Sequence, residues 1–128
     1  MSRILIAEDE AHILRVMSLW LKRHGHDILE APDGAAALEL LDREGADLLI
    51  SDMNMPRVDG FELVRAVRES RELAIPIMLL SARCDHDRLS RRMRPFHVLL
   101  FPKPFVPSRL VAEIDRLLAV HSAGDLPS

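Results

Sequence analysis

The residues that could do chemistry in this sequence stand at the ends of short apolar runs. Glu8 and Asp9 follow the first run, Asp52 follows the third, Ser81 follows the fourth, and Lys103 comes just after the fifth. Apolar runs of this length are typical of parallel strands that are buried on both faces. Functional groups of such sheets gather at the carboxyl ends of the strands, so we expect these side chains to meet at one edge.

A divalent cation is the simplest partner for such a group. Carboxylates that lie close together repel one another, which raises their pKa values, and a cation removes that conflict. Hard oxygen ligands without cysteine or clustered histidine favour Mg²⁺ or Mn²⁺ over zinc. A lysine and a serine beside the metal can bind phosphate oxygens, so the set is suited to phosphoryl transfer. The sequence has no glycine-rich P-loop, and a nucleotide is therefore not the expected donor.

The elements that must position these residues alternate along the chain. Apolar runs predict strands over 3–7, 27–31, 47–51, 75–80 and 97–101. Helical periodicity and capping residues predict helices over 11–24, 33–45, 61–67, 85–94 and 108–120. Strands that alternate with helices at this spacing indicate an α/β fold with a parallel sheet and right-handed crossovers.

Four sequence elements together resemble the receiver domain of two-component response regulators. They are Glu8-Asp9, the stretch D-x-x-M-P-x-x-D-G over 52–60, Ser81-Ala82, and Lys103-Pro104-Phe105. The resemblance covers residues 3–120. It implies a flavodoxin-like, doubly wound (βα)5 sandwich, with a five-stranded parallel sheet in the order 2-1-3-4-5 that the chemotaxis receiver shows.

The resemblance also implies a phosphoacceptor and a metal site. Asp52 would be phosphorylated by a phosphohistidine on a sensor histidine kinase or a histidine phosphotransfer protein. Mg²⁺, with Mn²⁺ as a possible substitute, would be bound by Asp9, Asp52 and the backbone carbonyl of Asn54. Glu8 would assist directly or through water.

Two further residues complete the implied site. Lys103 would pair with Asp52 and then with the phosphoryl group, and Ser81 would donate a hydrogen bond to that group. Asn54 and Arg83 occupy positions that tune dephosphorylation in this family. Simpler explanations exist for some of these residues: Glu8 could be an acid favoured by a helix N-terminus, and Ser81 could bond to the backbone at a strand end.

The sequence departs from the family before and within the fifth strand. Leu100 stands where receivers usually carry an aromatic switch residue, and 94–96 reads Arg-Pro-Phe where the fourth helix normally ends in a small-residue and glycine pair. That helix has only Leu89 and Met93 as apolar anchors among several arginines. We expect it to be short, irregular or mobile, and to become ordered on phosphorylation.

Composition restricts the class of protein. The chain has 128 residues, 48% hydrophobic and 29% charged, which predicts one folded domain. With the resemblance, we expect a receiver domain over 1–120 and a frayed tail over 121–128. A formal net charge of −3 gives no sign of direct nucleic-acid binding. The only cysteine, Cys84, excludes an intrachain disulfide, and the N-terminal apolar stretch is too short for a signal peptide or membrane span. We therefore expect a cytoplasmic protein without membrane contact.

The leading interpretation is a phosphorylation-controlled switch that binds an unknown downstream protein. It would not be an enzyme beyond transferring the phosphoryl group to itself and losing it again. One alternative is a small Mg²⁺-dependent phosphohydrolase with an aspartyl-phosphate intermediate. Phosphatases of the haloacid-dehalogenase type carry a second acid two residues after the nucleophile, and that position is Asn54 here. The chain could also be a scaffold, or a receiver cut from a larger regulator or hybrid kinase.

Overall fold

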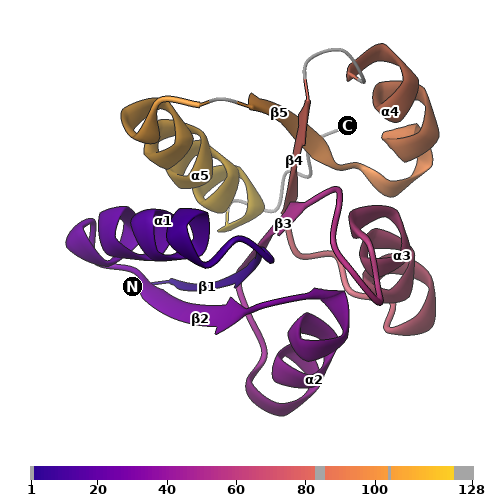
Figure 1. The fold of residues 1–128 in the computed structure, drawn as a ribbon, viewed down its shortest axis with the longest axis horizontal. Helices are drawn as coiled ribbons and strands as arrows, with labels where there is room; N and C mark the ends of the chain where they lie inside the picture. The colour runs from indigo at the N-terminus through magenta and orange to yellow at the C-terminus, as the bar shows by residue number, and fades with distance from the viewer. Residues whose placement is uncertain (1, 83–85, 104, 123–128) are drawn as a thin grey trace.

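The computed structural model describes residues 2–82, 86–103 and 105–122. Its centre is one five-stranded parallel sheet, in which the strands lie in the order β2-β1-β3-β4-β5 (Figure 1). The strands are β1 (Arg3–Ala7), β2 (Asp27–Ala31), β3 (Leu48–Asp52), β4 (Ile77–Ala82) and β5 (Leu99–Lys103). The predicted strand order is therefore confirmed.

Helices cover both faces of the sheet (Figure 1). On one face lie α1 (Ala11–Arg23) and α5 (Pro107–Ser122), which pack over one cluster of buried residues. On the other face lie α2 (Gly34–Glu44), α3 (Gly60–Arg65) and α4 (His86–Met93), over a second cluster. Helices on both faces of a parallel sheet make the doubly wound sandwich that was predicted.

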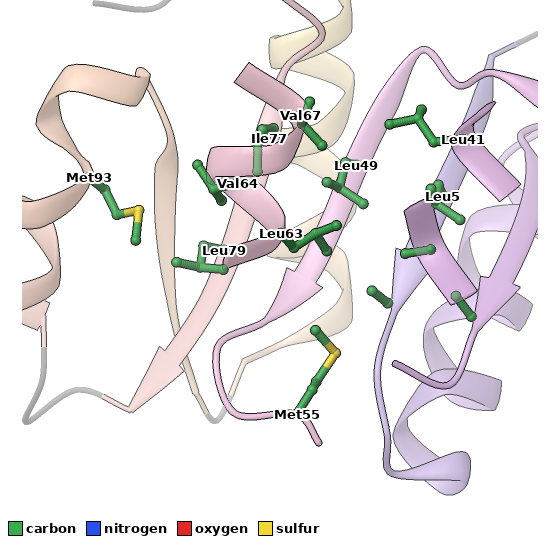
Figure 2. Packing of buried hydrophobic residues seen from close by; sticks show 13 residues of the cluster. Leu5, Leu41, Leu49, Met55, Leu63, Val64, Val67, Ile77, Leu79 and Met93 are labelled. Carbon is green, nitrogen blue, oxygen red and sulfur yellow. The ribbon is translucent and has the colours of Figure 1, made fainter. Parts of the chain in front are cut away.

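Alternation along the central strands explains why their sequences are apolar throughout. In β1, Ile4 and Ile6 belong to the cluster under α1 and α5, whereas Leu5 belongs to the opposite cluster. In β4, Leu79 and Leu80 divide in the same way. Successive side chains of a strand point to opposite faces, and both faces are buried here. Figure 2 shows the second cluster, which includes residues of the sheet and of α2 and α3.

The last two strands begin and end later than predicted. The fourth runs over Ile77–Ala82 instead of 75–80, and the fifth over Leu99–Lys103 instead of 97–101. His97 has a left-handed backbone with φ of 54°, which ends the preceding turn and cannot begin a strand. Pro102 is accepted inside β5 because this strand lies at the sheet edge. Ser81 and Lys103 are consequently the final residues of their strands or next to them.

The fourth helix is short, as predicted. α4 has eight residues, and its two apolar anchors, Leu89 and Met93, are 2% and 1% exposed. A 3-10 turn, η3 (Arg94–Phe96), follows it, with a proline where an α-helix would need a backbone N–H. Whether the segment changes order on phosphorylation stays a prediction.

Two predictions concern residues at the margins of the described chain. Arg83, assigned a tuning role, lies outside the described residues. Helix α5 extends to Ser122, two residues into the segment that was predicted as a tail, and 123–128 lie outside the described residues. The predicted domain limits of 1–120 stay a prediction.

Candidate functional site

The sheet brings the predicted site residues to its carboxyl edge. Glu8 directly follows β1, Asp52 is the last residue of β3, and Lys103 is the last residue of β5. Ser81 is paired with Pro102 in the register between β4 and β5, one position before the pair of Ala82 and Lys103. Parallel strands that end in the same layer thus align residues that are far apart in the sequence.

A lysine lies between two buried carboxyl groups at the centre of this edge. The Lys103 Nζ is 2.7 Å from Asp52 Oδ1 and 3.8 Å from Glu8 Oε2. The side chains of Asp52 and Glu8 are 7% and 0% exposed, whereas that of Lys103 is 25% exposed. The close contact is therefore an ion pair with Asp52, and Glu8 lies beyond hydrogen-bond distance of the ammonium.

The predicted acidic cluster is present. One oxygen from each of Glu8, Asp9 and Asp52 lies within 4.8 Å of the others. Glu8 Oε1 accepts a hydrogen bond from the Glu10 backbone N–H at 3.2 Å, but Glu8 Oε2 is buried without a hydrogen-bond donor in the described part of the chain. A buried carboxylate oxygen that lacks a donor fits a cation, and an all-oxygen donor set fits Mg²⁺.

Burial is the largest influence on the pKa values of the two buried carboxyl groups. Burial, with a further contribution from the charge of Asp52, raises the pKa of Glu8 to about 7. Burial also raises the pKa of Asp52, against the opposing effect of Lys103. At Lys103 burial acts to lower the pKa, but the hydrogen bond and charge of Asp52 outweigh it and the pKa is raised. Burial at this site therefore penalises the charged form of both carboxyl groups, and a cation bound there would offset that penalty.

Within the described residues, Ser81 lacks the backbone partner that its simpler explanation requires. The residue is 2% exposed, and its Oγ is buried without a hydrogen-bond partner among the described residues. The backbone bond that would make it an ordinary strand-end serine is therefore not found in the described part of the chain. A buried hydroxyl without a partner is uncommon and marks a position where a ligand oxygen could be bound.

The site opens into a cavity of about 600 Å³. Asp9, Asp52, Asn54 and Lys103 line its polar side, and Asn54 is exposed on the loop that follows β3. The apolar side was not predicted from the sequence: it is formed by Ile13 and Val16 of α1 together with Phe105 and Pro107. The spacing of Ile13 and Val16 along α1 was the signal available, since residues three apart share a helix face.

None of the described helices is long and apolar enough to cross a membrane.

Comparisons with known proteins agree with this geometry. Residues 4–115 match the model of the response regulator receiver domain. The chain is 37% identical over 117 residues to a probable transcriptional regulator, ycf27, of Galdieria sulphuraria, and 38% identical over 124 residues to the sensor histidine kinase TmoS of Ectopseudomonas mendocina. These matches cover 91% and 96% of this chain but only 45% and 13% of the two relatives.

Solved structures give the same result. The chemotaxis response regulator CheY4 of Vibrio cholerae has a TM-score of 0.83 and 30% identity, and the receiver domain of the hybrid histidine kinase CckA has a TM-score of 0.75 and 31% identity. Each alignment covers 91% of this chain and 98% of the solved chain. Since the family model spans most of the sequence and the fold agrees, the chain belongs to the response regulator receiver domain family.

Proposed function

We propose that this chain is the phosphoacceptor receiver of a two-component phosphorelay and that Asp52 accepts the phosphoryl group. The observation that supports this most directly is the contact of 2.7 Å between Asp52 Oδ1 and Lys103 Nζ, beside the acidic cluster and at the mouth of the cavity. This contact places a nucleophilic oxygen beside a cation and a candidate metal site, which are the groups that phosphoryl transfer uses.

The proposed reaction moves a phosphoryl group from a phosphohistidine to Asp52. A carboxylate oxygen of Asp52 attacks phosphorus, the bond between phosphorus and the histidine nitrogen breaks, and the imidazole leaves with a proton from solvent. Lys103 then pairs with the phosphoryl oxygens instead of with the carboxylate. The Ser81 hydroxyl, which has no partner in the described chain, donates to one of these oxygens.

Asp9, Asp52 and the backbone carbonyl of Asn54 would hold Mg²⁺, with Glu8 assisting. The ion would neutralise charge on the phosphoryl oxygens as they gather at the carboxylates. Mn²⁺ offers the same preference for oxygen ligands and would substitute. The all-oxygen cluster and the donor-free oxygen of Glu8 support this assignment.

The proposed phosphodonor is a sensor histidine kinase or a histidine phosphotransfer protein, and the proposed reader is a downstream protein. Relatives that match this chain include a probable transcriptional regulator and a sensor histidine kinase, both longer than the match. The proposal concerns the chemistry at Asp52 and therefore applies both to a stand-alone receiver and to a receiver within a larger protein. We place this chemistry in the cytoplasm.

Phosphorylation with a small-molecule donor tests the assignment. Wild-type protein incubated with acetyl phosphate and Mg²⁺ should gain one phosphoryl group, measured by intact-mass spectrometry, and Asp52→Asn should gain none. Asp47→Asn is the matched control, because Asp47 directly precedes β3, away from the site, and accepts from the Arg3 backbone N–H at 2.7 Å. Equal labelling of Asp52→Asn and wild type would refute the proposal.

A turnover assay with a second phosphate compound separates a receiver from a phosphohydrolase. A hydrolase needs a second acid to protonate the leaving group, and the residue two positions after Asp52 is the exposed amide Asn54. We expect single phosphorylation without sustained turnover of an alkyl phosphate, whose alkoxide leaving group needs a proton. Multiple turnovers that are lost in Asp52→Asn would favour the hydrolase instead.

A further inference from the structure

The loop between β3 and α3 contains a strained turn at Arg57. The Val58 N–H donates to the Pro56 carbonyl at 2.8 Å, which closes a three-residue turn around Arg57. Arg57 has φ of 66°, in the left-handed region that residues with a Cβ rarely occupy. A conformation of this kind persists only where surrounding contacts hold it, and such positions cluster at functional sites.

An ion pair to another element holds this turn. Arg57 Nη2 and Nε both donate to Asp33 Oδ2, at 2.6 Å and 3.1 Å. Asp33 also caps α2, since its Oδ1 accepts from the Ala36 N–H at 2.9 Å. The Asp33 side chain is 11% exposed and that of Arg57 is 65% exposed, so the carboxylate is fixed and the guanidinium reaches to it across the surface.

Close packing beside the ion pair fixes the loop at the same place. A Cβ added to Gly34 would lie 2.4 Å from the Val58 carbonyl oxygen and 2.7 Å from Val58 Cγ1. Loop and α2 therefore touch at adjacent residues, Asp33 with Arg57 and Gly34 with Val58. The first turn of α2 acts as a rigid support for the loop.

The supported loop carries Asn54, which lines the cavity beside Asp52. On the other side of Asn54, the loop is tied to the sheet, because the Met53 N–H donates to the Leu80 carbonyl at 3.0 Å. Met55 is 9% exposed and packs into the core cluster under α3, as Figure 2 shows. Asn54 is thus an exposed residue in a loop that is held at Met53, Met55 and Arg57, and among these three Arg57 is the one held by a side-chain ion pair.

We propose that Arg57 is a positioning residue for the phosphoacceptor site. Its ion pair with Asp33 holds the left-handed turn, and the turn holds the Asn54 backbone where it can bind a cation together with Asp9 and Asp52. This inference rests on the proposed function of Asp52. It assigns to the pair of Arg57 and Asp33 a role in Mg²⁺ affinity and phosphorylation rate that is separate from its effect on folding.

Two single variants and their combination test the role. Arg57→Gly removes the ion pair but adopts the left-handed turn without steric cost. Asp33→Asn keeps a capping side chain of similar quality and removes the charge. We expect each to raise the Mg²⁺ dissociation constant, measured by calorimetry, about fivefold, because the loop must be ordered on binding. The double variant should show the same increase as either single variant.

The readouts distinguish positioning from stability. Arg57→Gly should unfold in urea close to wild type while its Mg²⁺ affinity and its phosphorylation by acetyl phosphate both fall, and Arg57→Lys should recover part of each. Arg43→Gln, in an exposed pair within α2, is the control and should match wild type. Wild-type Mg²⁺ affinity in Arg57→Gly, or additive effects in the double variant, would overturn the proposal.

Failure of the proposed function would look different. If wild-type protein were labelled at a residue other than Asp52, the phosphoacceptor assignment would fall, whereas the Mg²⁺ titrations would still measure the contribution of Arg57. Asp52 could instead be labelled as proposed while Arg57→Gly and Asp33→Asn bind Mg²⁺ as tightly as wild type. That result would refute only the role of Arg57.

Discussion

Glu8 makes the stability of this protein depend on pH in a direction opposite to that of most acids. Its pKa is raised from 4.5 to about 7, first by burial and then by the charge of Asp52. The folded protein therefore binds this proton more tightly than the unfolded chain does. Stability from Glu8 is fully present below pH 4.5 and is lost as pH rises to about 7.

The matching prediction concerns Glu8→Gln in metal-free buffer. This variant keeps the shape and removes the charge, so at pH 8 it should exceed wild type in free energy of unfolding by about 3 kcal/mol. The two proteins should be equal near pH 4, and Mg²⁺ should reduce the difference at pH 8. Urea denaturation across this pH range measures it. Parallel curves for the two proteins would contradict the raised pKa.

Two buried serines on neighbouring strands offer a second prediction. Ser51 Oγ donates to the Asp52 carbonyl at 2.9 Å, whereas Ser81 Oγ has no partner in the described chain. Ser51→Ala should lower the free energy of unfolding by about 1 kcal/mol, because it removes a hydrogen bond. Ser81→Ala should leave stability within about 0.5 kcal/mol of wild type or raise it, while phosphorylation by acetyl phosphate slows. Equal destabilisation would show that Ser81 is a structural residue.

At the scale of elements, Arg68 joins the end of α3 to the segment that precedes β4 and to the turn that precedes β5. Arg68 lies in the π-helix η1 (Ala66–Ser70), which continues α3. Its Nη1 donates to the carbonyls of Leu73 and Ile75 at 2.8 Å and 2.7 Å, and its Nε donates to that of Phe96 at 2.8 Å. No carboxylate pairs with it in the described chain, and burial lowers its pKa.

Replacing Arg68 by methionine should therefore be costly. The change keeps the length of the side chain but leaves these carbonyls without their donor, and we expect a loss of about 2–4 kcal/mol in the free energy of unfolding. Arg116→Met is the control: it removes an exposed pair to Glu113, and should cost less than about 1 kcal/mol. Chemical denaturation that gave the two variants the same midpoint would contradict the role of Arg68.

The fourth helix yields a prediction about order. Leu89 and Met93 anchor α4, and Arg92 stacks over the Phe61 ring of α3 with its guanidinium carbon 4.1 Å from the ring centre. An eight-residue helix with this few contacts should open more often than α5. Hydrogen exchange should show faster exchange over 89–93 than over 110–118, and slower exchange over 89–93 after phosphorylation. Protection equal to that of α5, unchanged by phosphorylation, would refute this.

At the scale of the whole molecule, the predicted domain limit can be tested by truncation. The inward residues of α5 in the described chain include Leu117, which is 1% exposed, and its partly buried neighbour Leu118. Removing 121–128 should change the free energy of unfolding by less than about 0.5 kcal/mol. Removing 117–128 should cost at least about 3 kcal/mol, because both leucines leave the core. A loss of about 3 kcal/mol or more on removing 121–128 alone would place the domain boundary beyond residue 120.

The sequence by itself determined the architecture and most of the site. Unbroken apolar runs indicate strands that are buried on both faces, and a period of 3.6 residues indicates helices with one apolar face, which together predict a parallel sheet covered on both faces. Because parallel strands end in one layer, the positions of Asp52 and Lys103 after their apolar runs predicted that the two side chains would meet. Asp52 Oδ1 and Lys103 Nζ are 2.7 Å apart. Strand limits were less accurate, since the left-handed turn at His97 and the bonds of Arg68 are set by other elements.

Only the tertiary structure decided which hydrogen-bond and ion-pair partners the polar side chains of separate elements find. In the part of the chain that the structure describes, one oxygen of Glu8 lacks a donor and the hydroxyl of Ser81 lacks a partner. Both depend on how neighbouring strands pack, which local periodicity does not encode. The ion pair of Arg57 with Asp33 joins residues 24 positions apart and exists because α2 docks beside the loop that follows β3. Sequence patterns specify which face of an element is buried, whereas the packing of one element on another fixes the distance and angle between two particular atoms.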